Sequence, residues 1–188
     1  MHAFWIALFI VFVAEMGDKT QFMTLSFSTR YRTSIVLLGM CVGTLLISLI
    51  SVFVGMIVGK ALPFFWINLL AGIIFIGFGL WSLRGEGATE KIRPLGHLGP
   101  LLTVAATFFV AEIGDRTMLA TVMIASRERN FWGVWLGSTL GLVSANALAI
   151  VVGKILGKQL PAKVLKYGTA IIFVASGVLA IIQAWKKP

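Results

Sequence analysis

Length, composition and charge together exclude an ordinary water-soluble protein. Of the 188 residues, 59% are hydrophobic and only 12% are charged, whereas a soluble domain is about half apolar and a quarter charged. At ~20 apolar residues per bilayer-spanning helix, this length allows about six spans and leaves no room for a soluble catalytic domain. The net charge of +9 does not indicate nucleic-acid binding, because the basic residues lie in short clusters between apolar stretches, as in loops at a membrane surface.

Six apolar blocks follow one another along the chain. We place them at roughly 3–27, 34–58, 64–83, 98–125, 131–156 and 164–185. They are predicted to be helices, because backbone polar groups in lipid must be satisfied within the segment. We expect the first block to be kept as a membrane helix, since it lacks the marks of a signal peptide. A connecting loop at 84–97 separates two halves, 1–83 and 98–188.

An internal repeat relates these two halves. The segment AEMGDKT at 14–20 recurs as AEIGDRT at 111–117, which is 97 residues later. After a one-residue insertion the match continues at a shift of 98 and includes four pairs of glycines: Gly39, Gly43, Gly55 and Gly59 with Gly137, Gly141, Gly153 and Gly157. The chain is therefore two copies of a three-helix unit. Small residues at this spacing let helices pack closely, so we interpret the glycines as packing positions rather than ligands.

Three crossings per copy is an odd number, so the second copy must enter the membrane from the opposite side. The sequence thus predicts an all-α membrane protein with six transmembrane helices in two inverted three-helix repeats, which is typical of secondary transporters. Outside the motifs, nine Lys and Arg residues lie on one side and five on the other. This bias places the loop at 84–94 in the cytoplasm and both termini outside, in a cell (inner) membrane.

Four of the seven acidic residues lie near the middle of apolar blocks: Glu15, Asp18, Glu112 and Asp115. A charged side chain there costs at least ~2.5 kcal/mol. Glu and Asp at i and i+3 share one helix face, and the glycines between them permit close approach or local unwinding. If the copies pack about a pseudo-two-fold axis, all four carboxylates converge and repel one another strongly unless a cation is bound. The expected occupant is a divalent ion that prefers oxygen ligands, namely Ca²⁺, Mn²⁺ or Mg²⁺.

Residues beside the aspartates are candidates to complete the metal shell: Thr20, Gln21, Thr117 and Met118. Gln21 and Met118 are equivalent in the two copies, so one copy would offer an amide oxygen and the other a thioether. Transition metals accept thioether sulfur, whereas Ca²⁺ takes oxygen. The alternative is that Met118 is a flexible apolar packing residue.

Other polar residues in the spans have less direct roles. Lys19 and Arg116 are candidate counter-charges or gates, although the acidic residues could merely pair with them to stabilise a helix break. Asn146 and its counterpart Ser48 lie at mid-span, and we expect interhelical hydrogen bonds from them rather than metal ligation.

The pattern Glu-x-Gly-Asp-Lys/Arg-Thr/Ser, present twice, resembles the signature of the cation/proton exchanger family that includes the bacterial manganese exporter MneA and the Golgi manganese/calcium transporters. The resemblance covers essentially the whole chain. It implies export of Mn²⁺, with Ca²⁺ as the alternative, in exchange for protons, and it implies that the four acidic residues bind the metal. We expect no cofactor and no nucleic-acid partner; the partners are the metal ion, protons and the lipid bilayer, and a homodimer is left open.

Two other classes of function remain as alternatives. A lysine-exporter type of transporter would share the size and helix count, but four carboxylates exceed what one ammonium group requires. An inverted-repeat membrane phosphatase would need a nucleophile or general base with an Arg and Ser cluster for phosphate. No His lies at mid-span, and the only deep Arg is Arg116, inside the acidic motif. The sequence therefore favours divalent-cation transport over an enzyme.

Overall fold

The computed structural model describes residues 1–16, 18–83, 99–156 and 162–186. These residues form eight α-helices: α1 (His2–Glu15), α2 (Lys19–Arg30), α3 (Thr33–Ala61), α4 (Phe64–Ser82), α5 (Pro100–Glu112), α6 (Arg116–Glu128), α7 (Phe131–Leu156) and α8 (Ala162–Lys186). The predicted all-helical architecture is confirmed. Two of the six predicted blocks, 3–27 and 98–125, differ from the prediction because each is interrupted and forms two helices.

The two interruptions fall inside the acidic motifs, and their aspartates have the same backbone conformation. Asp18 lies just before α2 in an extended conformation (φ −77°, ψ 164°), and Asp115 lies before α6 in the same conformation (φ −75°, ψ 164°). The Asp18 N–H donates to the carbonyl of Glu15 at 3.1 Å, and the Asp115 N–H donates to that of Glu112 at 3.2 Å. At the second break Gly114 has φ +75°, which residues with a Cβ rarely adopt. Local unwinding at a glycine is therefore observed there, while Gly17 lies outside the described residues.

One detail of the sequence interpretation is wrong. Glu15 and Asp18 do not share a helix face, because α1 ends at the glutamate and α2 begins after the aspartate. Glu112 and Asp115 are separated in the same way by the break between α5 and α6. The extended residues at each break, rather than a continuous helical turn, set how the two carboxylates of a motif lie relative to each other.

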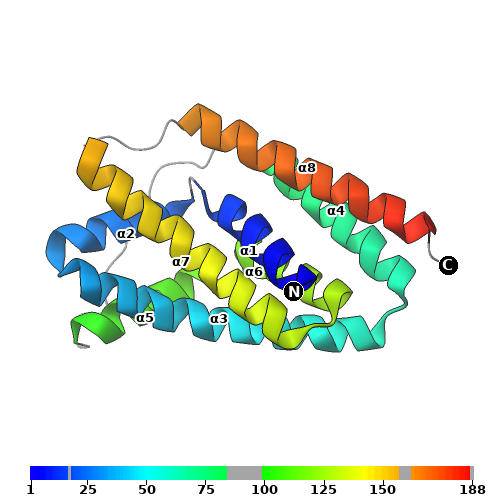
Figure 1. The fold of residues 1–188 in the computed structure, drawn as a ribbon, viewed down its shortest axis with the longest axis horizontal. Helices are drawn as coiled ribbons and strands as arrows, with labels where there is room; N and C mark the ends of the chain where they lie inside the picture. The colour runs from blue at the N-terminus through cyan, green and yellow to red at the C-terminus, as the bar shows by residue number, and fades with distance from the viewer. Residues whose placement is uncertain (17, 84–98, 157–161, 187–188) are drawn as a thin grey trace.

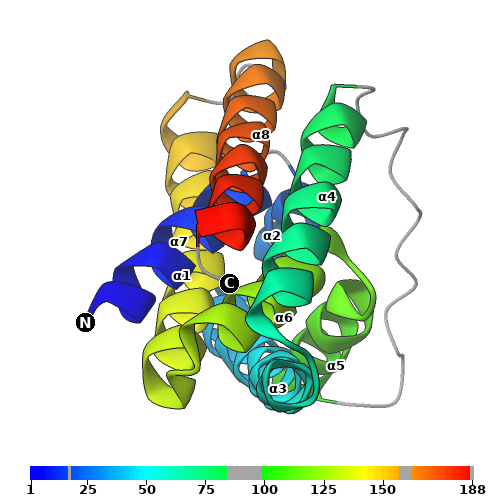
Figure 2. The ribbon, with the colours of Figure 1, turned by 90° about the vertical axis from the view of Figure 1, so that its right-hand side faces the viewer.

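The chain runs in opposite directions through the two halves. Figure 1 shows α3 running from left to right and α7 from right to left, and α4 and α8 are opposed in the same way. α1 packs along α7 of the other half, α5 and α6 pack along α3, and α4 packs along α8 (Figure 2). Each half therefore supplies partners for the helices of the other.

Equivalent glycines make equivalent close contacts between the halves. A Cβ added at Gly43 would lie 2.5 Å from the carbonyl oxygen of Ala105, and one added at Gly141 would lie 2.7 Å from that of Leu8. Neither position has room for a side chain, so α3 and α7 approach their partner helices backbone to backbone. Within the described residues, close backbone contacts confirm the interpretation as packing positions for Gly39, Gly43, Gly55, Gly59, Gly137 and Gly141.

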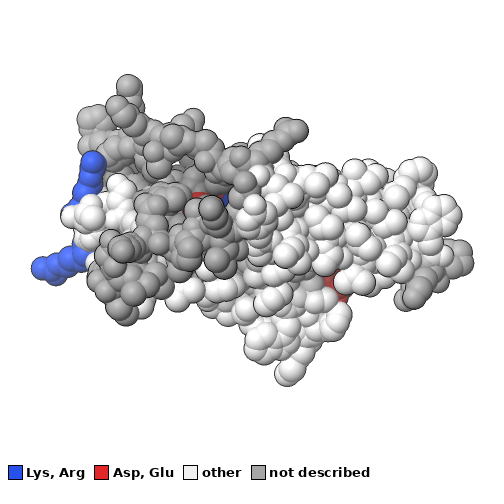
Figure 3. All heavy atoms as spheres, turned by 90° about the horizontal axis from the view of Figure 1, so that it is seen from above, with Lys and Arg blue, Asp and Glu red and all other residues white. Residues whose placement is uncertain are grey.

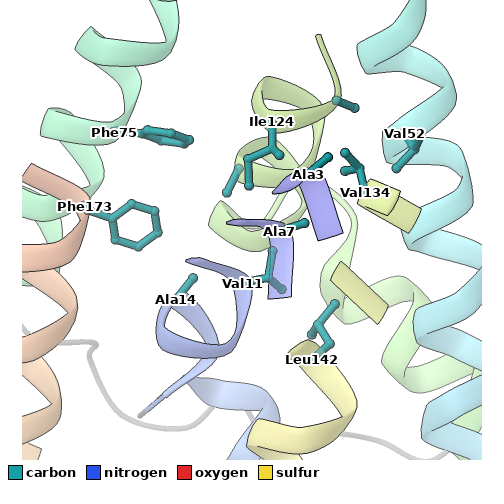
Figure 4. Packing of buried hydrophobic residues seen from close by; sticks show 12 residues of the cluster. Ala3, Ala7, Val11, Ala14, Val52, Phe75, Ile124, Val134, Leu142 and Phe173 are labelled. Atoms are coloured by element: carbon teal, nitrogen blue, oxygen red, sulfur yellow. The ribbon is translucent and has the colours of Figure 1, made fainter. Parts of the chain in front are cut away.

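Small side chains line the buried face of α1. Ala3, Ala7, Val11 and Ala14 recur every three to four residues and are fully or almost fully buried. Figure 4 shows them among larger side chains from α3, α6 and α7, namely Val52, Ile124, Val134 and Leu142. These small side chains let α1 pack closely against its neighbours in the interior. Glu15 directly follows Ala14 and is therefore buried as well.

The outer surface is largely apolar. Three helices among the described residues are long and apolar enough to cross a membrane: Thr33–Ala61, Phe64–Trp81 and Phe131–Val151. Figure 3 shows a face on which most described atoms are uncharged, with Lys and Arg side chains projecting at one end. Five tryptophans near the ends of the apolar blocks are exposed: Trp5, Trp66, Trp81, Trp132 and Trp185. An apolar surface of this extent suits lipid rather than water.

Candidate metal site

The four predicted acidic residues all lie at the two helix breaks. As whole residues, Glu15 and Asp18 are 0% exposed and Glu112 is 1% exposed, whereas Asp115 is partly exposed. A buried ionised carboxylate is costly unless it is paired or binds a cation. The two breaks therefore place acidic side chains in an interior that otherwise contains apolar and uncharged polar residues.

An ion pair links the two motifs across the halves. Arg116 Nη2 in the second motif donates to Asp18 Oδ1 in the first at 2.7 Å. Both side chains are largely shielded, with 13% and 1% exposed respectively. The structure thus links the two motifs, and it shows that Arg116 pairs with the aspartate of the other copy.

A threonine in each motif holds the glutamate of the same motif. Thr20 Oγ1 donates to Glu15 Oε1. Thr117 Oγ1 donates to Glu112 Oε2 at 2.5 Å and lies 3.4 Å from Asp115 Oδ2. Each hydroxyl therefore ties the helix before the break to the helix after it. Thr20 and Thr117 were predicted as metal ligands, and the structure places both in direct contact with the predicted acidic ligands.

Asn146 reaches the site from α7 of the second half. Its Nδ2 donates to Glu15 Oε1 at 2.9 Å, and its Oδ1 accepts from Thr24 Oγ1 at 2.7 Å. The expectation of interhelical hydrogen bonds is confirmed for Asn146 and is wrong for Ser48, whose Oγ makes no hydrogen bond within the described residues. The role of Thr24 was missed by sequence reasoning, although its match to Thr121 in the repeat marked it as a polar position shared by both copies.

Gln21 and Met118 both contact the breaks. Gln21 Nε2 lies 3.6 Å from Met16 Sδ and also donates to the Ala145 carbonyl at 3.2 Å. Met118 Sδ accepts from the Gly114 N–H at 3.2 Å. These equivalent residues thus lie beside the acidic motifs, with an amide in one copy and a thioether in the other.

The carboxylates do not form a compact cage. Among the described residues, no three His, Cys, Asp or Glu side chains are grouped closely enough to hold a metal ion. Within the same part of the chain, Glu15 Oε2 and Asp18 Oδ2 are buried without a hydrogen-bond partner. Anionic oxygens left in this way are energetically costly, and carboxylate oxygens are the ligands preferred by Ca²⁺, Mg²⁺ and Mn²⁺. These two atoms are suited to accept a cation.

Comparison with known proteins identifies the family. The chain matches the family described as divalent cation/proton antiporter GDT1 over residues 3–90 and 100–188. It belongs to the GDT1 family. The two matched segments coincide with the two halves that the repeat defines. Because the family is one of antiporters, the predictions of a cation/proton antiporter and of a transporter rather than an enzyme are confirmed, and the phosphatase and lysine-exporter alternatives are not supported.

Several relatives match along most of their length. A GDT1-like protein of Synechocystis is 31% identical, and the match covers 100% of this chain and 98% of the relative. A Vibrio cholerae protein named "Putative manganese exporter" is 28% identical, with 93% and 88% covered. GDT1-like protein 4 of Arabidopsis thaliana is 24% identical, with 95% and 94% covered. No solved structure matches the chain.

Proposed function

We propose that this GDT1 family member exports Mn²⁺ from the cytoplasm in exchange for protons, with Ca²⁺ as a second cargo. The observation that carries the proposal is the pair of acidic helix breaks, one from each half, joined by the Arg116–Asp18 ion pair. The Vibrio cholerae relative is named as a manganese exporter, which favours Mn²⁺. The cargo ligands are the four motif carboxylates, with oxygen or sulfur from neighbouring residues: Thr20, Gln21, Thr117 and Met118.

In the membrane the chain makes six crossings as two inverted three-helix units, residues 1–83 and 98–188, joined through 84–97. α1 with α2 forms one interrupted crossing, and α5 with α6 forms its counterpart. The opposed directions of α3 and α7, and of α4 and α8, support this topology (Figure 1). The distribution of Lys and Arg favours a cytoplasmic position for the loop at 84–94, which lies outside the described residues, and places both termini on the outer side of the cell (inner) membrane.

Arg116 and the cargo compete for Asp18. The guanidinium holds Oδ1 of this aspartate, while Asp18 Oδ2 and Glu15 Oε2 lack hydrogen-bond donors among the described residues. A divalent ion displaces the single charge of Arg116 because it interacts with several carboxylates at once. When the ion leaves, the carboxylates repel one another, so that protons and Arg116 take its place.

Proton exchange also accounts for the direction of transport. Moving a doubly charged ion out against an inside-negative potential costs ~4.6 kcal/mol per 100 mV, which is twice the value for one charge. Inward movement of two protons cancels this electrical work. The pH gradient then provides the net driving force for export.

Flux measurements in proteoliposomes test the proposal. The purified protein is reconstituted, Mn²⁺, Ca²⁺ and Mg²⁺ are offered separately, and a pH gradient is imposed or collapsed while the membrane potential is clamped. We expect Mn²⁺ movement in one direction to drive proton movement in the other, with Glu15→Gln vesicles as the inactive control. Mn²⁺ flux that ignores a collapsed pH gradient would contradict proton coupling, and the absence of any divalent flux would contradict metal transport.

A further inference from the structure

The two glutamates of the site have different surroundings across the interface between the halves. Asn146 on α7 is fully buried and contacts three elements: Nδ2 donates to Glu15 Oε1 at 2.9 Å and to the Leu142 carbonyl at 3.1 Å, and Oδ1 accepts from Thr24 Oγ1 at 2.7 Å. One amide thus links the end of α1, the middle of α2 and its own helix.

The neighbours of Asn146 determine how its amide is oriented. Two of them, Glu15 Oε1 and the Leu142 carbonyl, only accept hydrogen bonds when the glutamate is ionised. The NH₂ group must therefore face these oxygens, because a flipped amide would set its own oxygen against both of them. The remaining amide oxygen then accepts from the Thr24 hydroxyl, which also lies 2.8 Å from the Thr20 carbonyl.

The consequence for Glu15 is that its two carboxylate oxygens differ. Oε1 receives hydrogen bonds from both Thr20 and Asn146. Oε2 is buried and has no hydrogen-bond partner in the described segments. With one oxygen occupied by two donors, the carboxylate is held with the other oxygen open for a cation.

The equivalent position in the other half lacks this arrangement. Ser48 on α3 corresponds to Asn146 and is also buried, at 2% exposed, but its Oγ makes no hydrogen bond within the described residues. Thr121, the counterpart of Thr24, donates to the Thr117 carbonyl of its own helix at 2.9 Å. The serine hydroxyl is shorter than an asparagine amide, and within the described part of the chain Ser48 makes no hydrogen bond to Glu112 like the one that Asn146 makes to Glu15.

We infer that Asn146, oriented by Thr24, is a positioning residue that presets Glu15 as a single-oxygen metal ligand and makes the two halves of the site non-equivalent. This inference rests on the proposed metal transport. A group that orients a metal ligand typically changes metal affinity or activity by about 10- to 100-fold when it is removed. The effect is expected in the apparent affinity for the ion more than in the maximal rate, because the ligand itself remains.

Matched substitutions in the two halves test the inference in the full-length protein. Asn146→Ala and Asn146→Ser are compared with Ser48→Ala, and Thr24→Val is compared with Thr121→Val. For each variant, the KM and maximal rate of Mn²⁺ flux are measured in proteoliposomes, and Mn²⁺ binding is measured by titration calorimetry. We expect the Asn146 variants to raise KM and Kd by about 10-fold or more. Thr24→Val should raise them by a smaller factor, and the controls should stay within about two-fold.

Thr24→Val keeps the shape of the side chain. If the Asn146 variants fail to fold, the KM and Kd of this variant still test the inference. Wild-type KM and Kd in Asn146→Ser and Thr24→Val would overturn the inference. Equal losses in the Ser48 and Thr121 controls would overturn it as well, because the effect would then not be specific to the first half. Failure of the proposed function is recognised separately, since the wild-type protein would then show no metal binding or flux, whatever residue stands at position 146.

Discussion

The aspartates of the two acidic breaks have nearly the same backbone conformation but different side-chain surroundings. In the first break, Asp18 is buried and paired with Arg116, and Glu15 is held by Asn146 from the other half. In the second break, Asp115 is partly exposed, and Glu112 receives a hydrogen bond from Thr117 of its own motif. The comparison shows that the repeat determines the path of the chain, whereas single replacements between the copies determine the chemistry of each half.

This difference has a physical basis. Both helix breaks share a backbone hydrogen bond from the aspartate N–H to the glutamate carbonyl, and the sequence places a glycine in each motif. The contacts of each carboxylate depend on side chains that differ at equivalent positions, such as Asn146 and Ser48 or Gln21 and Met118. A pseudo-symmetric scaffold can therefore hold a site whose two halves perform different tasks.

The largest expected effect comes from removing the negative charges one at a time. Glu15→Gln, Asp18→Asn, Glu112→Gln and Asp115→Asn keep the side-chain shape and remove a charge that the divalent ion needs. We expect the first three to reduce Mn²⁺ flux by about 100-fold or more, and Asp115→Asn to have the smallest effect because this residue is partly exposed. Metal tolerance of cells and flux in vesicles measure the outcome. Wild-type tolerance in any two of these variants would contradict a shared site.

Removing the charge of Arg116 should mainly lower the thermal stability of the protein without bound metal. Arg116→Gln leaves the buried Asp18 carboxylate without its ion pair, which typically costs about 3–5 kcal/mol. Bound Mn²⁺ replaces the lost positive charge, so it should raise the melting temperature of the variant more than that of the wild type. Thermal unfolding with and without Mn²⁺ measures both shifts, with Arg116→Lys as the charge-retaining control. Equal shifts in variant and wild type would show that the ion and Arg116 do not share Asp18.

The two threonines should differ in their effect on metal affinity. Hydrogen bonds to charged groups are worth about 1.5–3 kcal/mol. Thr117→Val should raise the KM for Mn²⁺ more than Thr20→Val, because Glu15 keeps the hydrogen bond from Asn146, whereas Thr117 contacts both Glu112 and Asp115. Flux measured over a range of Mn²⁺ concentrations gives the KM of each variant. A larger effect of Thr20→Val would reverse the proposed difference between the halves.

The smallest expected effect concerns selectivity. If Met118 contributes its thioether to the cargo, Met118→Gln makes the two copies alike and should raise Ca²⁺ transport relative to Mn²⁺, since Ca²⁺ takes oxygen ligands. Competition between the two ions in vesicles measures the ratio. An unchanged ratio of Ca²⁺ to Mn²⁺ transport would show that Met118 has only a structural role, namely its contact with the Gly114 N–H at the helix break.

Much of the architecture could be predicted because its causes lie in local sequence. Continuous apolar blocks predict helices, and acidic residues near the middle of such blocks mark the site. The i, i+3 argument for Glu15 and Asp18 failed because it assumed an unbroken helix, whereas the chain is extended at Met16 and Asp18. The glycines between the acidic residues were the signal for a break, but composition alone does not distinguish a flexible helix from an interrupted one.

The sequence by itself determined the all-helical class, the two-fold repeat, the positions of the four carboxylates and the membership of a transporter family, because periodicity and motif are properties of neighbouring residues. The tertiary structure alone decided that Arg116 pairs with the aspartate of the other copy and that Asn146 holds Glu15, which is 131 positions away in the chain. Contacts of this kind depend on how α1 and α7 pack, where glycine and alanine let the backbones approach. No local pattern in the chain specifies which distant side chain will then lie within hydrogen-bonding distance.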